Sequence, residues 1–248
     1  MEQNDGDSSV THVASATRLS GDNRRPALSA NHLVKSFTNN VVLRDITFAV
    51  YAGEIVGLVG ANGAGKTTLL GILAQMLSAT SGDVSTAVEK PLLLEDRPAF
   101  ATQLTLQETL TLALTLSGLS RDVFSVTASL TRAGLLEVAH KPVKILSMGQ
   151  RQRLSWAHAL LLKPKVVLLD EPSAFLDPPG VIALREVLRE LRAHGTAILL
   201  SSHNLHEISL LADRVLLLAD GVLVDRGGCR DTSSAELEQS FFSVGDPS

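Results

Sequence analysis

One stretch of nine residues at positions 60–68, Gly-Ala-Asn-Gly-Ala-Gly-Lys-Thr-Thr, constrains the fold of this chain more than any other. It fits the phosphate-loop pattern G-x-x-x-x-G-K-[ST] at every fixed position. The apolar run at 54–59 before it favours a strand, and the apolar residues at 69–77 after it favour a helix. A strand, a glycine-rich loop and a helix in this order are the context that the pattern requires. A chance match at a glycine-rich turn is therefore a poor explanation.

The residue types in this stretch suit the binding of nucleotide phosphates. Three glycines let the backbone turn tightly and present N–H groups to phosphate oxygens, and the N-terminus of the following helix adds partial positive charge. Lys66 can reach the β- and γ-phosphates, and the hydroxyl of Thr67 can ligate Mg²⁺. The loop therefore predicts a nucleotide with β- and γ-phosphates, together with Mg²⁺, as ligands. The predicted nucleotide-binding residues of the loop are Gly60, Ala61, Asn62, Gly63, Ala64, Gly65, Lys66, Thr67 and Thr68.

The composition favours a soluble globular protein. The 248 residues are 45% hydrophobic and carry a net charge of −4, so no excess of basic residues points to nucleic acid. The single cysteine excludes an internal disulfide. No run approaches the length of a transmembrane helix, and residues 1–25 lack the basic start and apolar core of a signal peptide.

Three later runs, at 166–169, 197–200 and 215–218, are short and continuously apolar. Strands that are buried on both faces of a parallel sheet have this composition. Between the first two runs, residues 181–191 place their apolar side chains on one helical face. A strand, a helix and a strand give a parallel crossover, so the sequence predicts an α/β core with a mostly parallel sheet.

Two other parts of the chain differ from this core. Residues 31–37 and 41–50 are rich in β-branched and aromatic residues around a turn-forming Thr-Asn-Asn, which predicts an antiparallel hairpin. The further short strands predicted nearby lie at 82–88 and 92–94. Residues 100–162, in contrast, carry only helical signals and predict an inserted helical subdomain.

The helices of this subdomain are marked by their N-terminal residues. A capping box at Thr105 predicts a helix that ends near Leu116, and residues 122–136 carry a second helical pattern. A second capping box at Ser147 predicts a helix that stops at Pro164. We expect a disordered tail at 1–26, one nucleotide-binding domain at 27–230 that contains the helical subdomain, and a tail or short helix at 231–248.

Two adjacent carboxylates, Asp170 and Glu171, follow the apolar run at 166–169. A buried strand delivers Asp170 to the carboxyl edge of the sheet, where it can hold Mg²⁺ directly or through water. Alternation along the strand predicts that Glu171 points to the other side of the strand end, where it can polarise the attacking water.

The order of further motifs resembles the ATP-binding cassette (ABC) ATPases. Residues 146–153, Leu-Ser-Met-Gly-Gln-Arg-Gln-Arg, resemble the signature sequence, which is usually L-S-G-G-Q. Residues 171–177 are similar to the second carboxylate motif running into the D-loop, and residues 201–204 look like the switch-histidine segment. Phe37 lies where the family places an aromatic residue that stacks on adenine. The resemblance covers residues 28–228 approximately.

This resemblance implies the fold and the activity. The fold is that of an ABC-type P-loop NTPase, with a mostly parallel sheet core, an antiparallel β subdomain and an inserted helical subdomain. The activity is ATP hydrolysis with Mg²⁺. The implied catalytic residues are Lys66, Glu171 and His203, the implied metal ligands are Thr67, Asp170 and Asp96, and the D-loop residue is Asp177.

The resemblance also implies partners. The signature residues Ser147, Met148, Gly149 and Gln150 would clamp the γ-phosphate of an ATP held by a second ATPase subunit, in a homodimer or a heterodimer. The implied membrane partner is an integral permease on a separate chain, contacted at the cytoplasmic face of the cell membrane, and no nucleic acid is implied. Only a short segment follows residue 228. A single cassette with a short helical insertion and so short a C-terminal segment resembles the exporter branch.

Two positions depart from the family pattern. Met148 stands where glycine is usual, at a position that tolerates variation. Asp96 stands where spacing places the glutamine of the Q-loop, and an aspartate is shorter and charged but can ligate Mg²⁺. The haem-exporter ATPases of cytochrome c maturation are similar in lacking that glutamine.

Two other functions remain possible interpretations beside that of a transporter subunit. One is a soluble ABC ATPase that acts on ribosomes or DNA; the single cassette and the absence of a long heptad segment between the phosphate loop and the signature argue against it. The other is a binding module that does not hydrolyse ATP; intact Lys66, Asp170 and Glu171 argue against that.

Overall fold

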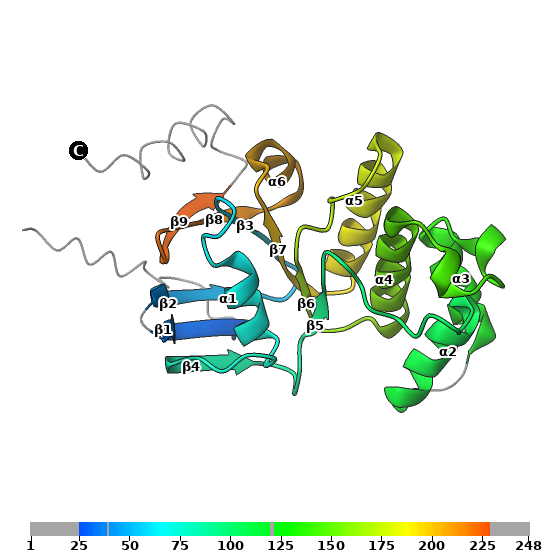
Figure 1. Ribbon diagram of the computed structural model, residues 1–248, viewed down its shortest axis with the longest axis horizontal. Helices are drawn as coiled ribbons and strands as arrows, with labels where there is room; N and C mark the ends of the chain where they lie inside the picture. The colour runs from blue at the N-terminus through cyan, green and yellow to red at the C-terminus, as the bar shows by residue number, and fades with distance from the viewer. Residues whose placement is uncertain (1–24, 39, 120–121, 229–248) are drawn as a thin grey trace, which may run out of the picture.

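In the described part of the chain, two β-sheets pack with helices, and α2, α3 and α4 lie together at one end (Figure 1). The computed structural model describes residues 25–38, 40–119 and 122–228. The predicted tail at 231–248, and all but the last two residues of the predicted tail at 1–26, lie outside the described residues.

The larger sheet has six strands in the order β5-β6-β7-β3-β8-β9. The first five strands are parallel to their neighbours, and β9 is antiparallel to β8. The mostly parallel sheet core that the sequence predicts is confirmed. The strands are β3 (Ile55–Val59), β5 (Leu92–Leu94), β6 (Val166–Leu169), β7 (Ala197–Ser202), β8 (Arg214–Ala219) and β9 (Val222–Gly228).

Alternate residues of this sheet belong to two separate hydrophobic cores. Val166 and Leu168 pack in the core that contains α1 (Lys66–Leu73), whereas Val167 and Leu169 pack with α5 (Pro178–Ala193) and α6 (Leu205–Leu211). All four of these side chains are buried. Because both faces of the strand are covered, its sequence is continuously apolar. The predicted crossover is also confirmed, since α5 joins the parallel neighbours β6 and β7.

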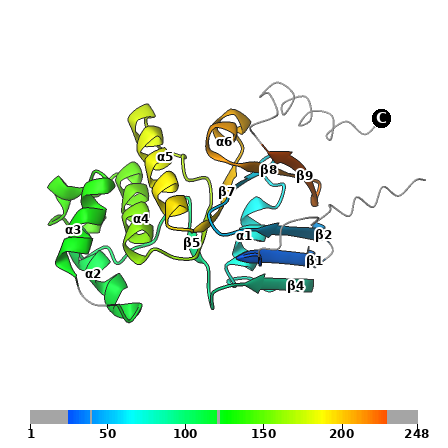
Figure 2. The ribbon, with the colours of Figure 1, turned by 180° about the vertical axis from the view of Figure 1, so that it is seen from behind.

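The smaller sheet is antiparallel and lies at the end of the molecule opposite the helical group α2–α4 (Figures 1 and 2). Its order is β2-β1-β4, in which Leu28 pairs with Val50 and with Thr86. The predicted hairpin is confirmed as β1 (Leu28–Phe37) and β2 (Asn40–Val50), and the predicted strand at 82–88 is β4 (Ser81–Thr86).

Within the described part of residues 100–162 the regular structure is helical apart from one isolated bridge, Thr105 to Pro142. Both predicted capping boxes form, with Thr105 accepting from the N–H of Glu108 and Ser147 accepting from the N–H of Gln150. The helices are α2 (Leu106–Leu116), α3 (Val123–Arg132), η1 (Leu136–Val138), η2 (Val143–Ile145) and α4 (Met148–Leu162).

Two predicted helices are shorter than their sequence patterns. The helix expected at 69–77 is α1, which ends at Leu73 because Gln75 adopts a left-handed backbone with φ 58°. The helix expected over 122–136 ends at Arg132, where Gly134, with φ 68°, lets the N–H of Leu135 reach the carbonyl of Leu130 at 2.8 Å. In each case the apolar pattern of the sequence extends past the last residue of the helix. The pattern therefore does not reveal the turn that caps the helix.

Candidate nucleotide-binding and catalytic site

The phosphate loop connects the central strand β3 to the N-terminus of α1. Gly65 precedes the helix with φ 104°, a conformation that favours glycine. At Gly60 an added Cβ would lie 2.5 Å from the carbonyl oxygen of Leu218, so no larger residue fits there without displacing the backbone. The loop is therefore held tightly between the sheet and α1, with its backbone close to neighbouring strands.

Lys66 is the first residue of α1, and its side chain is almost fully buried, with 7% exposed. Its Nζ donates to the carbonyl of Gly60 at 2.8 Å and to that of Ala61 at 3.3 Å. The same ammonium lies 3.4 Å from Oε1 of Glu171. A buried cation needs such partners, because an unpaired charge away from water is costly. Lys66 thus connects the phosphate loop to the end of β6.

Asp170 joins the helix N-terminus to the neighbouring strand β7. The Thr67 hydroxyl donates to Oδ2 of Asp170 at 2.7 Å, and the Ser201 hydroxyl donates to Oδ1 at 2.6 Å. Asp170 is buried, and Ser201 is fully buried. Hydroxyl and carboxylate oxygens are the donor set that Mg²⁺ prefers. The residues therefore fit this metal, and Thr67 and Asp170 are the side chains that can hold it.

Glu171 points toward the phosphate loop, so the prediction that it points to the other side of the strand end is wrong. The backbone of Glu171 is left-handed, with φ 45°, and this departure from strand geometry breaks the alternation of side chains. Its N–H donates to Oγ of Ser201 at 3.0 Å, which holds the turn. Its Oε2 lies 2.8 Å from Nδ1 of His203. One carboxylate therefore contacts both Lys66 and His203.

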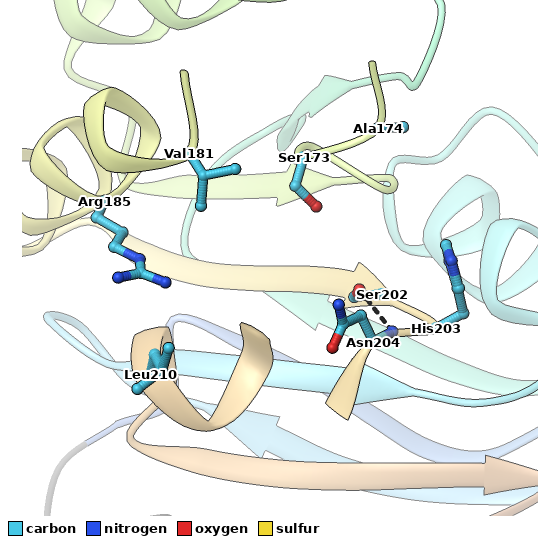
Figure 3. A pocket seen from close by; sticks show the side chains of 8 residues that line it. All are labelled: Ser173, Ala174, Val181, Arg185, Ser202, His203, Asn204 and Leu210. Atoms are coloured by element: carbon cyan, nitrogen blue, oxygen red, sulfur yellow. Dashed lines mark hydrogen bonds between the residues drawn. The ribbon is translucent and has the colours of Figure 1, made fainter. Parts of the chain in front are cut away.

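His203 follows β7 and borders a pocket of about 400 Å³ between α5, the loop after β6 and the β7–α6 connection (Figure 3). Its side chain is 62% exposed, so the ring is open to a ligand. Figure 3 shows Arg185 on the opposite side of this pocket from His203. The N–H of Asn204 donates to Oγ of Ser202 at 3.0 Å and fixes the turn that carries the histidine.

Phe37 ends β1, where it pairs with Asn40 at the tip of the hairpin. The same hairpin reaches the phosphate loop, because a Cβ on Gly65 would lie 3.1 Å from the side chains of Val42 and Leu43. The ring of Phe37 is 44% exposed, and Nζ of Lys35 lies 4.6 Å from its centroid. An exposed ring at this end of the hairpin can stack on a nucleotide base.

The signature residues lie at the N-terminus of α4. Gln150 uses its side chain to accept from the N–H of Ser147 at 3.1 Å, which completes the capping box. A Cβ on Gly149 would lie 3.2 Å from the carbonyl oxygen of Phe175, so the helix approaches the D-loop closely. Within the described residues, no hydrogen bond or ion pair of residues 147–150 reaches the phosphate loop at 60–68. The structure therefore does not bring these two predicted sites together.

The two remaining predicted residues, Asp177 and Asp96, have structural contacts. Asp177 caps α5 by accepting from the N–H of Gly180 at 2.9 Å. Asp96 lies in the loop after β5, and its Oδ2 is 3.8 Å from Nε of Arg97. Its described contacts do not include Thr67 or Asp170.

The sequence did not reveal two buried polar residues of the site. Ser201 contacts both carboxylate residues that follow β6, and its place beside them depends on the pairing of β6 with β7. Gln152 donates from α4 to the carbonyl of Asp96 at 2.7 Å. The sequence signal for Gln152 was its polar side chain on an otherwise apolar helix face, because a buried polar group is unusual unless it is hydrogen-bonded.

The comparisons with known proteins identify the class. The family described as ABC transporter matches residues 43–174, more than half of the chain. A second description, AAA domain, putative AbiEii toxin, Type IV TA system, matches residues 141–209 and overlaps the first. The chain therefore belongs to the ABC transporter ATP-binding family. As a member, it binds ATP and is an ATPase.

Curated relatives extend this similarity over most of the chain. The uncharacterized ABC transporter ATP-binding protein YxlF of Bacillus subtilis is 38% identical, over 86% of this chain and 75% of its own. The zinc import ATP-binding protein ZnuC of Cereibacter sphaeroides is also 38% identical, over 88% of this chain and 89% of its own. The lantibiotic transport ATP-binding protein SrtF of Streptococcus pyogenes is 31% identical, over 79% of this chain and 89% of its own. The last two relatives have different cargoes in their names.

A solved structure of the ATP-binding subunit of an ABC transporter matches the fold. Its TM-score is 0.77 at 28% identity, and the match covers 87% of this chain and 99% of that one. The predicted ABC-type P-loop fold is thereby confirmed. Within the described residues, no helix combines the length and the apolar character needed to cross a membrane.

Proposed function

We propose that this chain is the ATP-hydrolysing subunit that energises transport through a separate integral membrane subunit, bound at the cytoplasmic face of the cell membrane. The observation that carries the proposal is the position of Glu171, whose carboxylate contacts Lys66 on one side and His203 on the other. A base, a cation and an imidazole beside a phosphate loop are the groups that water attack on a γ-phosphate requires.

Each group has a distinct task in this proposal. The backbone N–H groups of residues 60–68 and the ammonium of Lys66 bind the phosphates, and Phe37 stacks on the adenine. Thr67 and Asp170 would hold Mg²⁺, which would supply positive charge to neutralise the phosphates. Glu171 accepts a proton from the attacking water, and His203 hydrogen-bonds the γ-phosphate. Ser201 keeps both carboxylates in place, because it contacts Asp170 and the backbone of Glu171.

Dimerisation completes the site. The N-terminus of α4 carries unpaired N–H donors and a partial positive charge, which suit an anion. Within the described residues no hydrogen bond or ion pair joins it to the phosphate loop of the same chain, which supports an ATP supplied by a second subunit. We therefore assign Ser147, Met148, Gly149 and Gln150 to the γ-phosphate of the partner's ATP, and Asp177 to the D-loop at the same interface.

The direction of transport is proposed as export. The support is the resemblance of the single cassette and its short helical insertion to the exporter branch. Relatives named for zinc import and for lantibiotic transport both match the chain, so a transport experiment decides the direction. Asp96 is proposed to contact Mg²⁺ in place of the Q-loop glutamine, as in the haem-exporter ATPases that lack that glutamine.

Reconstitution with the membrane subunit tests this proposal. The full chain, copurified with its membrane partner, is placed in vesicles with the ATPase facing outward. Export predicts ATP-dependent accumulation of a labelled lantibiotic peptide inside, whereas import predicts ATP-dependent release of preloaded Zn²⁺. An ATPase that binds no membrane protein, and that ribosomes stimulate instead, would contradict the transport function.

A further inference from the structure

An arginine with no acidic partner lines the pocket that His203 borders. Arg185 lies on α5 and extends into the space between this helix and the β7–α6 connection (Figure 3). The residue is half-buried, and its Nε is fully buried without a hydrogen-bond partner. Within the described residues the guanidinium forms no ion pair. Because a charge that is partly removed from water needs compensation, this pocket favours an anion.

The rest of the pocket wall mixes polar and apolar side chains. Ser173, Ser202 and Asn204 lie on it together with His203. No described residue that lines the pocket is acidic. The pocket has a volume of about 400 Å³, and one water molecule takes about 30 Å³. A phosphate ion with several waters therefore fits.

His203 belongs both to this pocket and to the catalytic groups. Its Nδ1 lies 2.8 Å from Oε2 of Glu171, so Nε2 is the ring nitrogen that remains for a ligand. Glu171 in turn lies 3.4 Å from Nζ of Lys66. The three side chains form a row from the phosphate loop to the pocket. An ion that leaves the loop on this side meets His203 first and then Arg185 on the opposite wall.

The chemistry of Arg185 suits phosphate in particular. A guanidinium presents its N–H donors in a planar fork that matches two phosphate oxygens, and such charge-assisted hydrogen bonds are strong. Hydrolysis converts ATP and water into ADP and inorganic phosphate. The β-phosphate of ADP stays on the backbone N–H groups of the phosphate loop and on Lys66. Inorganic phosphate has lost its covalent link to the nucleotide, so it is the product that can move to Arg185.

We propose that this pocket binds inorganic phosphate, and that it receives the phosphate released by ATP hydrolysis as this product leaves the catalytic site. Arg185 supplies the positive charge, and His203 contacts the ion through Nε2. The inference rests on the proposed function. It gives phosphate a route out of the site that does not require ADP to leave the phosphate loop first.

The test titrates inorganic phosphate into the full chain by calorimetry, with saturating ADP and Mg²⁺ to occupy the phosphate loop. Arg185→Gln removes the charge, whereas Arg185→Lys keeps it. The matched control is Arg189→Gln, one turn further along α5, where the arginine side chain is 66% exposed and pairs with Glu186. The ATPase rate of each chain at rising phosphate concentrations shows whether the same site takes the product.

We expect wild type and Arg189→Gln to bind phosphate with equal affinity. Arg185→Gln should bind it about tenfold to a hundredfold more weakly, and Arg185→Lys should lose less. Inhibition of hydrolysis by added phosphate should weaken in the same order, while the affinity for ADP stays at the wild-type value.

Equal phosphate affinity in Arg185→Gln and wild type would overturn the inference. Binding through Arg185 that does not inhibit hydrolysis would also overturn it, because the pocket would then not take the product. A wild type that binds phosphate through Arg185 but does not hydrolyse ATP would instead contradict the proposed function.

Discussion

The carboxylate of Glu171 lies 2.8 Å from Nδ1 of His203, in a turn where Glu171 has a left-handed backbone. A non-glycine residue in this conformation costs of order 1–3 kcal/mol and persists only where its surroundings enforce it. Ser201 supplies that constraint by accepting the N–H of Glu171 at 3.0 Å. This arrangement brings together the carboxylate of Glu171, the imidazole of His203 and the ammonium of Lys66.

Replacing Lys66 by alanine should weaken ATP binding by about tenfold to a hundredfold, because hydrogen bonds to a charged group contribute about 1.5–3 kcal/mol. Calorimetric titration with ATP measures the change. Lys90→Ala, at an exposed position before β5, is the matched control and should bind like wild type. Equal affinity in Lys66→Ala and wild type would show that this lysine does not contact the phosphates.

Replacing Ser201 by alanine should lower both stability and the hydrolysis rate. The substitution leaves a buried carboxylate oxygen of Asp170 and the N–H of Glu171 without their shared partner, at a cost of about 1–3 kcal/mol. Denaturant unfolding and steady-state ATPase assays measure the two effects. Ser202→Ala, which removes only the acceptor for the N–H of Asn204, should lose less of both. If the two variants behave alike, Ser201 has no special role in holding the carboxylates.

The replacement of Asp96 by asparagine removes a negative charge and keeps the size. If Asp96 contacts Mg²⁺, the ATPase rate of this variant should depend less on Mg²⁺ concentration. Stability should change little, because the carbonyl that receives Gln152 is unaltered. Rates measured over a range of Mg²⁺ concentrations test this, with Asp83→Asn on β4 as an exposed control. An Mg²⁺ dependence identical to wild type would make Asp96 an ordinary loop residue.

Stability should fall at acid pH partly through His158 of α4. Burial lowers the pKa of His158 below the ordinary value of histidine, so the folded state binds a proton less readily than the unfolded chain does. This contribution to the free energy of unfolding is complete above about pH 6.5 and is lost as pH falls through the folded-state pKa.

The pH dependence of a variant isolates this effect. In His158→Gln the decline between about pH 7 and pH 5 should be smaller than in wild type, because the group that gains a proton on unfolding is gone. Urea unfolding at each pH gives the free energies. His194→Gln, at an exposed position after α5, should keep the wild-type decline. A decline of the same size in His158→Gln would assign the acid sensitivity to other groups.

Local signals in the sequence predict much of this fold. Short apolar runs identify β6, β7 and β8 because both faces of the sheet are covered. Capping boxes identify the starts of α2 and α4, since their hydrogen bonds span only three residues. The strand β9 was missed although its turn is readable: Asp220 and Gly221 both have positive φ, as a two-residue hairpin turn requires.

The candidate site was less predictable because it depends on contacts between distant segments. Glutamate gives no sequence signal for the left-handed backbone at position 171, so the predicted direction of the Glu171 side chain is wrong. The double contact of Ser201 requires β6 and β7 to be paired in their particular register. Gln152 and the Asp96 carbonyl are 56 residues apart, and only the packed α4 brings them together.

In the proposed function, Glu171 is the base for ATP hydrolysis. An amide in its place cannot take a proton from water, but it keeps the size and the contact distance to Lys66 and His203. Glu186→Gln, an exposed carboxylate of α5 that pairs with Arg189, is the matched control and should hydrolyse like wild type.

The most direct measurement compares ATP binding, hydrolysis and oligomeric state in Glu171→Gln and wild type. Glu171→Gln should bind ATP as tightly as wild type, hydrolyse it slower by orders of magnitude, and elute as an ATP-bound dimer in size-exclusion chromatography. Hydrolysis at the wild-type rate by Glu171→Gln would contradict this role of Glu171.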